Sequence, residues 1–308
     1  LINLMILMNA NNAIKQISLP APAKINLFLA VTGKRDDGFH EISSVIAKID
    51  LCDLVTLEKT EQIDEVQCLC IGNNSLSGKN NLAYKAIEEW RKFTGDRTGM
   101  KVTIKKRIPL MAGLGGGSSD AVATLLGLNF YHGQPYSNEE LFILAEKLGS
   151  DCPFFLSGGL GHATGRGEKV RLISDRKKNE LNGQRIFLFQ PPIGFSTHLI
   201  YRSLAEYGLY SDSTKALKYV EDWEAGRRSI SNFCHNDFES VILTKFLFLK
   251  PLFEELKNCF GLSFQVSGSG SCCFSFASEN INENDVKDLI ENSLGKKSQF
   301  WASRIRLT

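Results

Sequence analysis

Residues 109 to 121 read PLMAGLGGGSSDA, and four of the five positions from Gly113 to Gly117 are glycine. Glycine in regular structure costs roughly 0.5–1 kcal/mol relative to alanine, so such a run is unfavourable unless the chain needs a bare backbone there. Apolar residues recur at helical spacing from position 122 onward. We therefore expect a glycine loop that leads directly into a helix, with Ser118 or Ser119 as its N-cap and Asp120 in its first turn.

A loop of this kind is suited to binding an anion. Free backbone N–H groups and the positive end of the helix dipole converge at the start of the helix, and glycines let a phosphate approach the backbone closely. The common phosphate-loop patterns do not fit, because GxxxxGK[ST] is absent and Ser118 occupies the last glycine position of GxGxxG. The sequence predicts a phosphate site, and the alternative is a flexible turn whose glycines serve only tight packing.

Composition narrows the class of ligand. The chain has 308 residues with a formal net charge of +2, a length that suggests two domains. Lysine and arginine are spread along the sequence, which argues against a nucleic-acid or membrane partner and favours a small molecule. Eight cysteines without a CxxC pair indicate reduced cytosolic thiols, and we expect Cys272 and Cys273 to serve packing. The apolar start LINLMILM is too short to span a membrane, and we interpret it as a disordered start.

Strands and helices are both expected along the chain. Alternating apolar residues predict strands at 24–31, 66–71, 101–106 and 185–190. Helical patterns occur at 81–93 and after Ser137, where Ser137 and Glu140 form a capping box and Gly149 ends the helix. The polar stretch 174–184 is the expected boundary between two domains, at 15–173 and 185–308. Mixed elements of this kind indicate an α+β or α/β architecture.

Three motifs together resemble one known family. The segment PLMAGLGGGSS (109–119) resembles the phosphate-binding motif of the GHMP small-molecule kinases, whose loop wraps the phosphates of ATP. PAKINLFLAVTGKRDDGFHEISSV (22–45) resembles the N-terminal signature of one branch of that family, and VSGSGSCCF (266–274) resembles its C-terminal glycine motif. The motifs stand in family order, and the resemblance covers residues 18 to 305.

The resemblance implies a fold and an activity. The fold would be α+β, with a ribosomal protein S5 domain 2-like N-terminal domain and a ferredoxin-like C-terminal domain. The activity would be ATP- and Mg²⁺-dependent phosphorylation of the 2-hydroxyl of 4-diphosphocytidyl-2-C-methyl-D-erythritol, in the non-mevalonate route to isoprenoid precursors. We also expect a monomer or weak homodimer. The absence of a Ser- and Arg-rich transit segment favours a bacterial cytoplasm over a plastid.

Phosphoryl transfer to an alcohol needs a cradle for the leaving diphosphate, positive charge near the transferred group, and a base or orienting group. By resemblance, Asp151 takes the acceptor proton and Lys24 orients the hydroxyl and offsets developing charge. The alternatives are a helix N-cap for Asp151 and a surface lysine for Lys24. The resemblance does not identify Mg²⁺ ligands. The cradle would consist of Pro109, Leu110, Met111, Ala112, Gly113, Leu114, Gly115, Gly116, Gly117, Ser118 and Ser119.

The acceptor site is expected to hold a flat, neutral cytosine by stacking and by polar contacts to its edge. The resemblance implies that Phe39 and Tyr201 sandwich the base and that His40 reads its edge. The family usually has tyrosine where Phe39 stands, so a hydrogen bond from that hydroxyl is lost here. Asn26 and Thr197 match positions that contact the methylerythritol part.

The last of the expected site residues lie in the glycine turn at 268–271. Gly268, Ser269 and Gly270 would close the site by resemblance, whereas a tight turn between two strands is the alternative. Each aromatic residue of the acceptor site could equally belong to the core. The rival functions are a GHMP kinase that acts on homoserine, mevalonate or a sugar, and a non-catalytic ligand sensor on the same scaffold.

Overall fold

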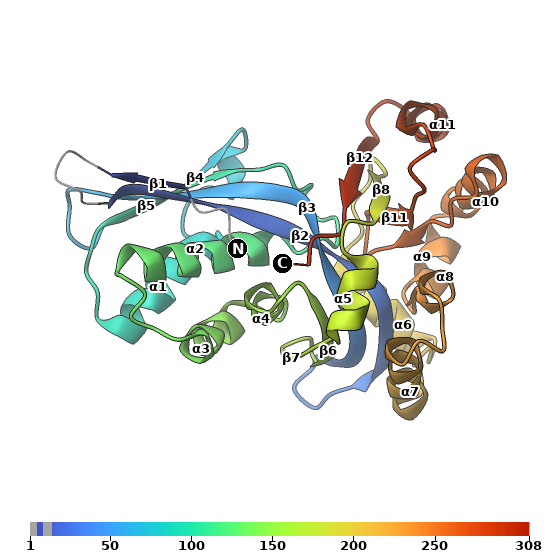
Figure 1. Ribbon diagram of the computed structural model, residues 1–308, viewed down its shortest axis with the longest axis horizontal. Helices are drawn as coiled ribbons and strands as arrows, with labels where there is room; N and C mark the ends of the chain where they lie inside the picture. The colour runs from blue at the N-terminus through green and yellow to red at the C-terminus, as the bar shows by residue number, and fades with distance from the viewer. Residues whose placement is uncertain (1–4, 9–13, 308) are drawn as a thin grey trace.

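The computed structural model describes residues 5–8 and 14–307. Its N-terminal half is built on a mixed sheet with the strand order β1-β2-β3-β5-β4, to which β6, β7 and β9 are added (Figure 1). The strands are β1 (Met5–Met8), β2 (Ile14–Lys34), β3 (His40–Lys59), β4 (Val66–Ile71), β5 (Met100–Lys105), β6 (Leu160–Gly165), β7 (Lys169–Leu172) and β9 (His235–Asn236).

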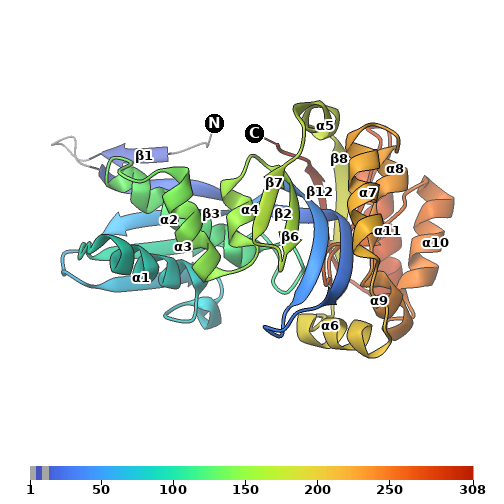
Figure 2. The same ribbon diagram turned by 90° about the horizontal axis from the view of Figure 1, so that it is seen from below.

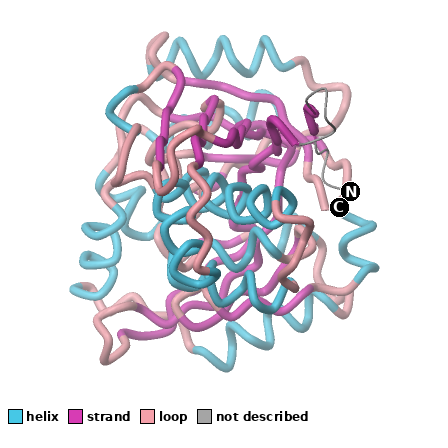
Figure 3. Tube along the Cα trace, turned by 90° about the vertical axis from the view of Figure 1, so that its left-hand side faces the viewer, coloured by secondary structure: helices cyan, strands magenta, loops and turns pink. Residues whose placement is uncertain are grey.

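A layer of helices covers one face of this sheet, as the end-on view in Figure 3 shows. Helix α2 packs against both β2 and β3, and α1 and α3 pack against α2. The apolar face of the sheet is thereby removed from water, which is the main stabilising contribution of such a layer. The elements of this layer are α1 (Leu82–Thr94), α2 (Gly116–Tyr131), α3 (Asn138–Leu148) and α4 (Cys152–Leu156), with a short 3-10 helix η1 (Asn74–Leu76) beside β4.

The C-terminal half contains an antiparallel sheet with the strand order β10-β11-β8-β12. Its strands are β8 (Arg185–Gln190), β10 (Gln265–Val266), β11 (Cys273–Phe276) and β12 (Gln299–Arg304). The helices of this half are α5 (Asp175–Leu181), α6 (Thr197–Glu206), α7 (Ser213–Glu224), α8 (Ile230–Phe233), α9 (Glu239–Lys245), α10 (Leu249–Phe260) and α11 (Glu283–Leu294).

The long β2–β3 hairpin joins the two halves. It pairs from Gln16↔Glu58 to Lys34↔His40, with register shifts that let it bend. Figure 2 shows its far end curving toward the C-terminal helices, where α7 packs on it. Every residue from Ala23 to Val31 is buried, because both faces of the hairpin are covered there. The hairpin therefore carries the N-terminal motif into the junction between the halves.

The apolar core crosses this junction. One cluster of buried side chains combines Ile25 and Leu27 of β2 with Leu188 of β8 and Trp223 of α7. Fully burying a side chain of this size contributes about 1.5–3 kcal/mol. The pairing of β9 with β2 adds backbone hydrogen bonds between the halves. The expected domain bounds of 15–173 and 185–308 remain a prediction, since the two parts share both a core and a sheet.

The strongest local patterns of the sequence are confirmed. All four expected strands occur, within β2 and as β4, β5 and β8, and the helix expected at 81–93 is α1. Ser137 and Glu140 form the predicted capping box of α3, and Gly149 stands at the C-cap of that helix. Cys272 and Cys273 are fully buried, as expected for residues that serve packing.

Most of the polar stretch 174–184 forms helix α5, and the domain boundary expected there stays a prediction. Leu181 is fully buried, and Lys177 is 2% exposed with its ammonium 4.9 Å from the centre of the Trp223 ring. A lysine with a long apolar stem can cover a hydrophobic surface, and so this polar-looking segment packs.

Two further expectations need correction. Helix α2 begins at Gly116 with Gly115 as its N-cap, so Ser118, Ser119 and Asp120 all lie inside the helix. Gly115 adopts φ 68° and ψ 17°, a left-handed conformation that lets the loop enter the helix earlier than a serine cap would. At the start of the chain, residues 5–8 form strand β1, paired with β2, whereas residues 1–4 of the expected disordered start lie outside the described residues.

Candidate active site

A cleft of about 1140 Å³ lies where the β2–β3 hairpin, the glycine loop and the C-terminal half meet. Of the predicted ATP loop, Met111, Gly113, Gly115 and Ser118 line it. The remaining predicted loop residues do not line the cleft; they are Pro109, Leu110, Ala112, Leu114, Gly116, Gly117 and Ser119. Every other predicted site residue does line it: Lys24, Asn26, Phe39, His40, Asp151, Thr197, Tyr201, Gly268, Ser269 and Gly270.

The glycine loop requires glycine for both conformation and space. Gly113 has φ 74°, and a Cβ there would lie 2.2 Å from the carbonyl oxygen of Ser267. A Cβ on Gly115 would lie 3.0 Å from the Phe155 ring and 3.1 Å from the stem of Lys24. The loop is thus packed tightly on one side and open to the cleft on the other. This geometry fits a phosphate cradle better than a flexible turn.

The second glycine turn is fastened directly to the first. Backbone N–H groups of Ser271 and Cys272 donate to the carbonyls of Met111 and Ala112, at 3.2 and 3.1 Å. The hydroxyls of Ser269 and Thr197 lie 2.7 Å apart, which ties the turn to the start of α6. The two glycine segments therefore form one wall of the cleft, although about 155 positions separate them in sequence.

Lys24 and Asp151 meet at the centre of this wall. Lys24 is 5% exposed, its Nζ donates to Asn26 Oδ1 at 2.6 Å, and it lies 3.8 Å from Asp151 Oδ2. The amide of Asn26 donates in turn to Ser44 Oγ at 2.8 Å. The backbone N–H of Lys24 donates to the Leu114 carbonyl at 3.0 Å, which fixes the lysine against the glycine loop. Lys24 is therefore a buried cation with partners and not a surface lysine.

Asp151 stands at the N-cap position of α4, yet its side chain makes no capping hydrogen bond. Its side chain is 39% exposed, so the carboxylate is accessible from the cleft. A carboxylate that neither caps its helix nor is fully paired is available to accept a proton from a bound alcohol. Asp151 therefore occupies an N-cap position, but its carboxylate oxygens make no capping hydrogen bond.

The aromatic residues gather at the other end of the cleft. The rings of His40 and Tyr201 stack with centroids 4.7 Å apart, and the Phe238 and Tyr201 rings are nearly perpendicular with centroids 4.6 Å apart. Phe39 is 49% exposed, with the guanidinium of Arg166 5.1 Å from its ring centre. One face of Tyr201 is therefore covered by His40, and the predicted sandwich of a base between Phe39 and Tyr201 remains a prediction.

His40 carries an unusual polar feature. Its Nε2 is buried and has no hydrogen-bond partner among the described residues. Burial, together with the nearby Lys34 ammonium, lowers the pKa of His40 below its ordinary value, so the ring is neutral near pH 7. A neutral imidazole offers one donor and one acceptor, which are the contacts needed at the edge of a nucleobase.

Asn236 and Glu239, which were not expected from the sequence, also hold the cleft together. Asn236 is buried, and its side-chain amide donates to the carbonyls of Val266 and Gly268, each at 2.8 Å. Glu239 accepts from the Val266 N–H at 2.6 Å, and burial raises the pKa of its carboxyl to about 7. The signal available in the sequence was the polar run HNDFE at 235–239, placed between two helical segments.

A charged network behind the glycine loop was also missed. Lys106 Nζ donates to Asp53 Oδ2 at 2.5 Å and to Asp120 Oδ2 at 2.7 Å. The other oxygen of Asp53 accepts from the backbone N–H groups of Arg107 and Ile108, which lead into the loop. Burial raises the pKa of Asp120 to about 7. Asp120 therefore anchors the loop from behind instead of serving as a first-turn acid.

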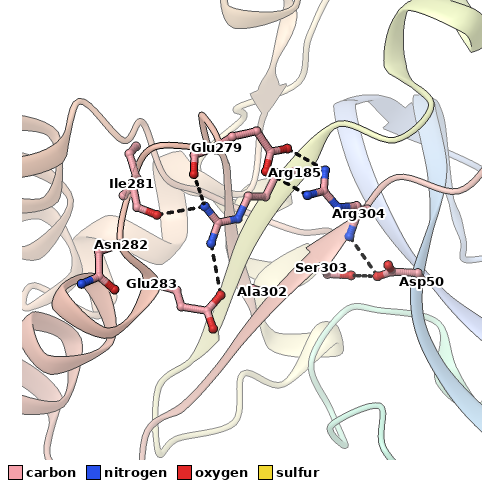
Figure 4. A pocket seen from close by; sticks show the side chains of 9 residues that line it. All are labelled: Asp50, Arg185, Glu279, Ile281, Asn282, Glu283, Ala302, Ser303 and Arg304. Carbon is pink, nitrogen blue, oxygen red and sulfur yellow. Dashed lines mark hydrogen bonds and ion pairs between the residues drawn. The ribbon is translucent and has the colours of Figure 1, made fainter.

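A second hollow, of about 450 Å³, lies at the edge of the C-terminal sheet (Figure 4). Arg304 pairs with Glu279 through both terminal nitrogens, and Arg185 pairs with Glu283. Asp50 of β3 accepts from the Ser303 hydroxyl at 2.5 Å. The arginines and glutamates that line this hollow are paired with one another, and the Asp50–Ser303 hydrogen bond ties β3 to the C-terminal sheet. The hollow is therefore not a second candidate site.

In residues 5–8 and 14–307, no group of three or more His, Cys, Asp or Glu side chains is arranged to hold a metal ion. Mg²⁺ in phosphoryl-transfer sites takes much of its coordination from phosphate oxygens and water, so the cleft is compatible with an ion that arrives with a nucleotide.

None of the described helices is both long and apolar enough to cross a bilayer.

Comparisons with known proteins agree with this geometry. The family models "GHMP kinases N terminal domain" and "GHMP kinases C terminal" match residues 81–159 and 214–295. A 4-diphosphocytidyl-2-C-methyl-D-erythritol kinase of Carboxydothermus hydrogenoformans is 37% identical, over 85% of this chain and 88% of that protein. The protein of the same name from Desulfitobacterium hafniense is also 37% identical, over 84% and 86%.

Solved structures show the same relationship. A crystal structure of a 4-(cytidine 5'-diphospho)-2C-methyl-D-erythritol kinase aligns with a TM-score of 0.73 and 30% identity, over 94% of this chain and 99% of that one. Homoserine kinase from Cytophaga hutchinsonii aligns with a TM-score of 0.68 at 15% identity, over 96% of each chain. The second likeness concerns the fold alone.

Proposed function

Because the chain belongs to the 4-diphosphocytidyl-2-C-methyl-D-erythritol kinases, a branch of the GHMP kinases, we propose that its cleft transfers the γ-phosphoryl group of ATP to the 2-hydroxyl of that cytidine compound. The chain is thus a phosphotransferase with an alcohol as acceptor, and the step would supply isoprenoid precursors. A bacterial cytoplasmic location and a monomer or weak homodimer remain predictions.

One observation supports the proposal above all others: the phosphate cradle and the Lys24–Asp151 pair share a single cleft. The stem of Lys24 lies against the position where a Gly115 side chain would stand, and its ammonium lies 3.8 Å from Asp151. A phosphate held at Gly113 and Gly115 would therefore be close to both a cation and a free carboxylate. Phosphoryl transfer depends on this kind of positioning more than on covalent chemistry by the protein.

Each of these residues has a distinct role in the proposed reaction. The acceptor oxygen bonds to the γ-phosphorus while the bond from that phosphorus to the β,γ-bridging oxygen breaks, and ADP leaves. Asp151 accepts the proton of the hydroxyl, and the Lys24 ammonium offsets the negative charge that develops near the transferred group. Mg²⁺ would neutralise charge on the phosphate oxygens when bound. Asn26 holds the Lys24 ammonium in place through its 2.6 Å hydrogen bond.

The aromatic end of the cleft supports a cytidine-linked acceptor. Phe39 presents an exposed ring on which a base can stack, and the paired rings of His40 and Tyr201 supply a second aromatic wall. The unpartnered Nε2 of His40 provides a polar contact for the edge of the base. Arg166 also lines the cleft beside Phe39, where its positive charge suits the diphosphate of the acceptor.

The proposal is tested by ADP release from ATP and Mg²⁺ with a panel of alcohols: the cytidine compound, homoserine, mevalonate and a hexose. We expect activity on the cytidine compound alone. Activity on homoserine or mevalonate in its place would make the chain a GHMP kinase of different specificity. Nucleotide binding without ADP release from any acceptor would favour a ligand sensor.

A further inference from the structure

Two lysines lie directly opposite each other in the β2–β3 ladder. Lys24 pairs with Lys48 in the antiparallel register. Directly opposed residues of such a pair point to the same face of the sheet, so both lysines reach the same neighbouring element. That element is α4, the five-residue helix that carries Asp151 at its N-cap. Lys24 belongs to the proposed mechanism, whereas Lys48 has no role in it.

Lys48 contacts the opposite end of α4. Its Nζ donates to the carbonyl oxygens of Phe155 and Ser157, at 3.0 and 2.8 Å. Its backbone N–H donates to the Gly159 carbonyl at 2.8 Å, just beyond the helix. In the part of the chain that the structure describes, no carboxylate lies within ion-pairing distance of this ammonium. The last carbonyls of α4 therefore provide its hydrogen-bond partners.

The partly buried Lys48 ammonium has carbonyl oxygens as its partners in place of a carboxylate. Burial lowers the pKa of Lys48 to about 8, so holding the ammonium here is unfavourable for the charged form. A positive charge at the negative end of a helix dipole, with direct bonds to unpaired carbonyls, offsets part of that penalty. The ammonium thereby caps a helix too short to be stable by itself.

Helix α4 connects this contact to the reacting groups. Asp151 begins the helix, and Phe155 on its last turn places its ring against Gly115 of the phosphate loop. A shift of α4 that displaces Asp151 would therefore move its carboxylate relative to the Lys24 ammonium. Displacements of about 1 Å at a catalytic group can reduce turnover by roughly a hundredfold.

We propose that Lys48 is a positioning residue for Asp151: it holds the C-terminal end of α4, while Lys24 faces the N-terminal end of the same helix. The inference rests on the proposed function, in which Asp151 takes the acceptor proton. It predicts that Lys48 affects the rate of transfer through Asp151 and not the binding of either substrate.

The test is a double-mutant cycle with Lys48→Met and Asp151→Asn, assayed with ATP and the cytidine acceptor. Alone, Lys48→Met is expected to lower kcat by about 10- to 100-fold with the KM of both substrates nearly unchanged. In the Asp151→Asn background the same change should alter kcat by less than about twofold, because the position of a group that no longer takes the proton matters little. Lys59→Met, at an exposed position of the same strand, is the matched control and should keep full activity.

Several results would overturn the inference. Equal losses in both backgrounds would show that Lys48 acts on folding or binding in general, and an unchanged kcat would show that α4 needs no such support. If Lys48→Met does not fold, Lys48→Gln is assayed in its place, with the same loss confined to kcat expected. If Asp151→Asn keeps its full kcat, the proposed role of Asp151 fails first, and the inference about Lys48 fails with it.

Discussion

At the scale of single residues, we propose that Asp151 takes the proton of the acceptor and that the buried Lys24 ammonium offsets developing charge. Asp151→Asn keeps the shape of the side chain but cannot take a proton at neutral pH. We expect kcat to fall by about 10²–10⁴-fold, with the Kd of ATP unchanged. Lys24→Met should act similarly. Steady-state kinetics and nucleotide titration check this, and a loss below about tenfold would indicate that Asp151 is only structural.

Tyr201 is expected to act through its ring. Tyr201→Ala removes an aromatic wall and the partner of His40, so the KM of the cytidine acceptor should rise by the equivalent of about 1–3 kcal/mol, with the KM of ATP unchanged. Tyr201→Phe should be nearly silent, because the hydroxyl makes no hydrogen bond to the described residues. A rise in the KM of ATP with no rise for the acceptor would place these rings in the adenine pocket or the core.

Glu239 gives the fold a pH dependence that can be measured. Its pKa is raised to about 7 in the folded chain, so the folded state holds its proton more tightly than the unfolded state does. The protonated Glu239 carboxyl therefore contributes its full stabilisation of the fold at low pH. This contribution is lost as the pH rises through about 7. Denaturant unfolding at pH 5.5 and pH 8 should show Glu239→Gln gaining about 1–3 kcal/mol relative to the original chain over that interval. A constant difference between the two proteins would contradict the assignment.

At the scale of elements, the glycine loop leads directly into α2, and we propose that the two bind the nucleotide as one unit. Gly115→Val should weaken ATP binding, because the side chain would be forced into a left-handed backbone and against Phe155 and Lys24. Gly95→Val is the matched control, since Gly95 has φ 74° at the end of α1 with open space around it. The control should lose stability but keep its affinity for ATP, measured by titration. Unchanged affinity in folded Gly115→Val would remove the loop from the nucleotide site.

The elements also show which parts of the fold can be predicted from sequence. The capping box of α3 was predictable, because its partners are three residues apart. The start of α2 was not, because Gly115 in a left-handed conformation is the N-cap in place of a serine, and the sequence does not reveal that Phe155 and Lys24 leave little room for a side chain there. Helix α5 was not predicted, because composition does not reveal that Lys177 is buried with its ammonium 4.9 Å from the centre of the Trp223 ring.

At the scale of the whole molecule, the candidate site exists only because three distant segments converge. The glycine motifs and the Lys24 strand could be recognised singly, and the predicted site residues outside the ATP loop do line one cleft. The contacts of Asn236, Lys48 and Lys106 could not be predicted. Asn236 and Lys48 bond to backbone carbonyls that lie about 30 to 109 positions away, and a sequence pattern carries no record of such partners.

In the proposed reaction, the γ-phosphoryl group is placed on a hydroxyl of the methylerythritol part of the acceptor. The most direct measurement is ³¹P NMR of the product formed from ATP, Mg²⁺ and 4-diphosphocytidyl-2-C-methyl-D-erythritol. We expect one new phosphomonoester resonance without three-bond splitting by a proton, because carbon 2 of a 2-C-methyl compound carries no hydrogen. The cytidine diphosphate resonances should be retained, and ADP should form in equal amount. ADP with free phosphate and no new ester, or an ester on the ribose, would contradict it.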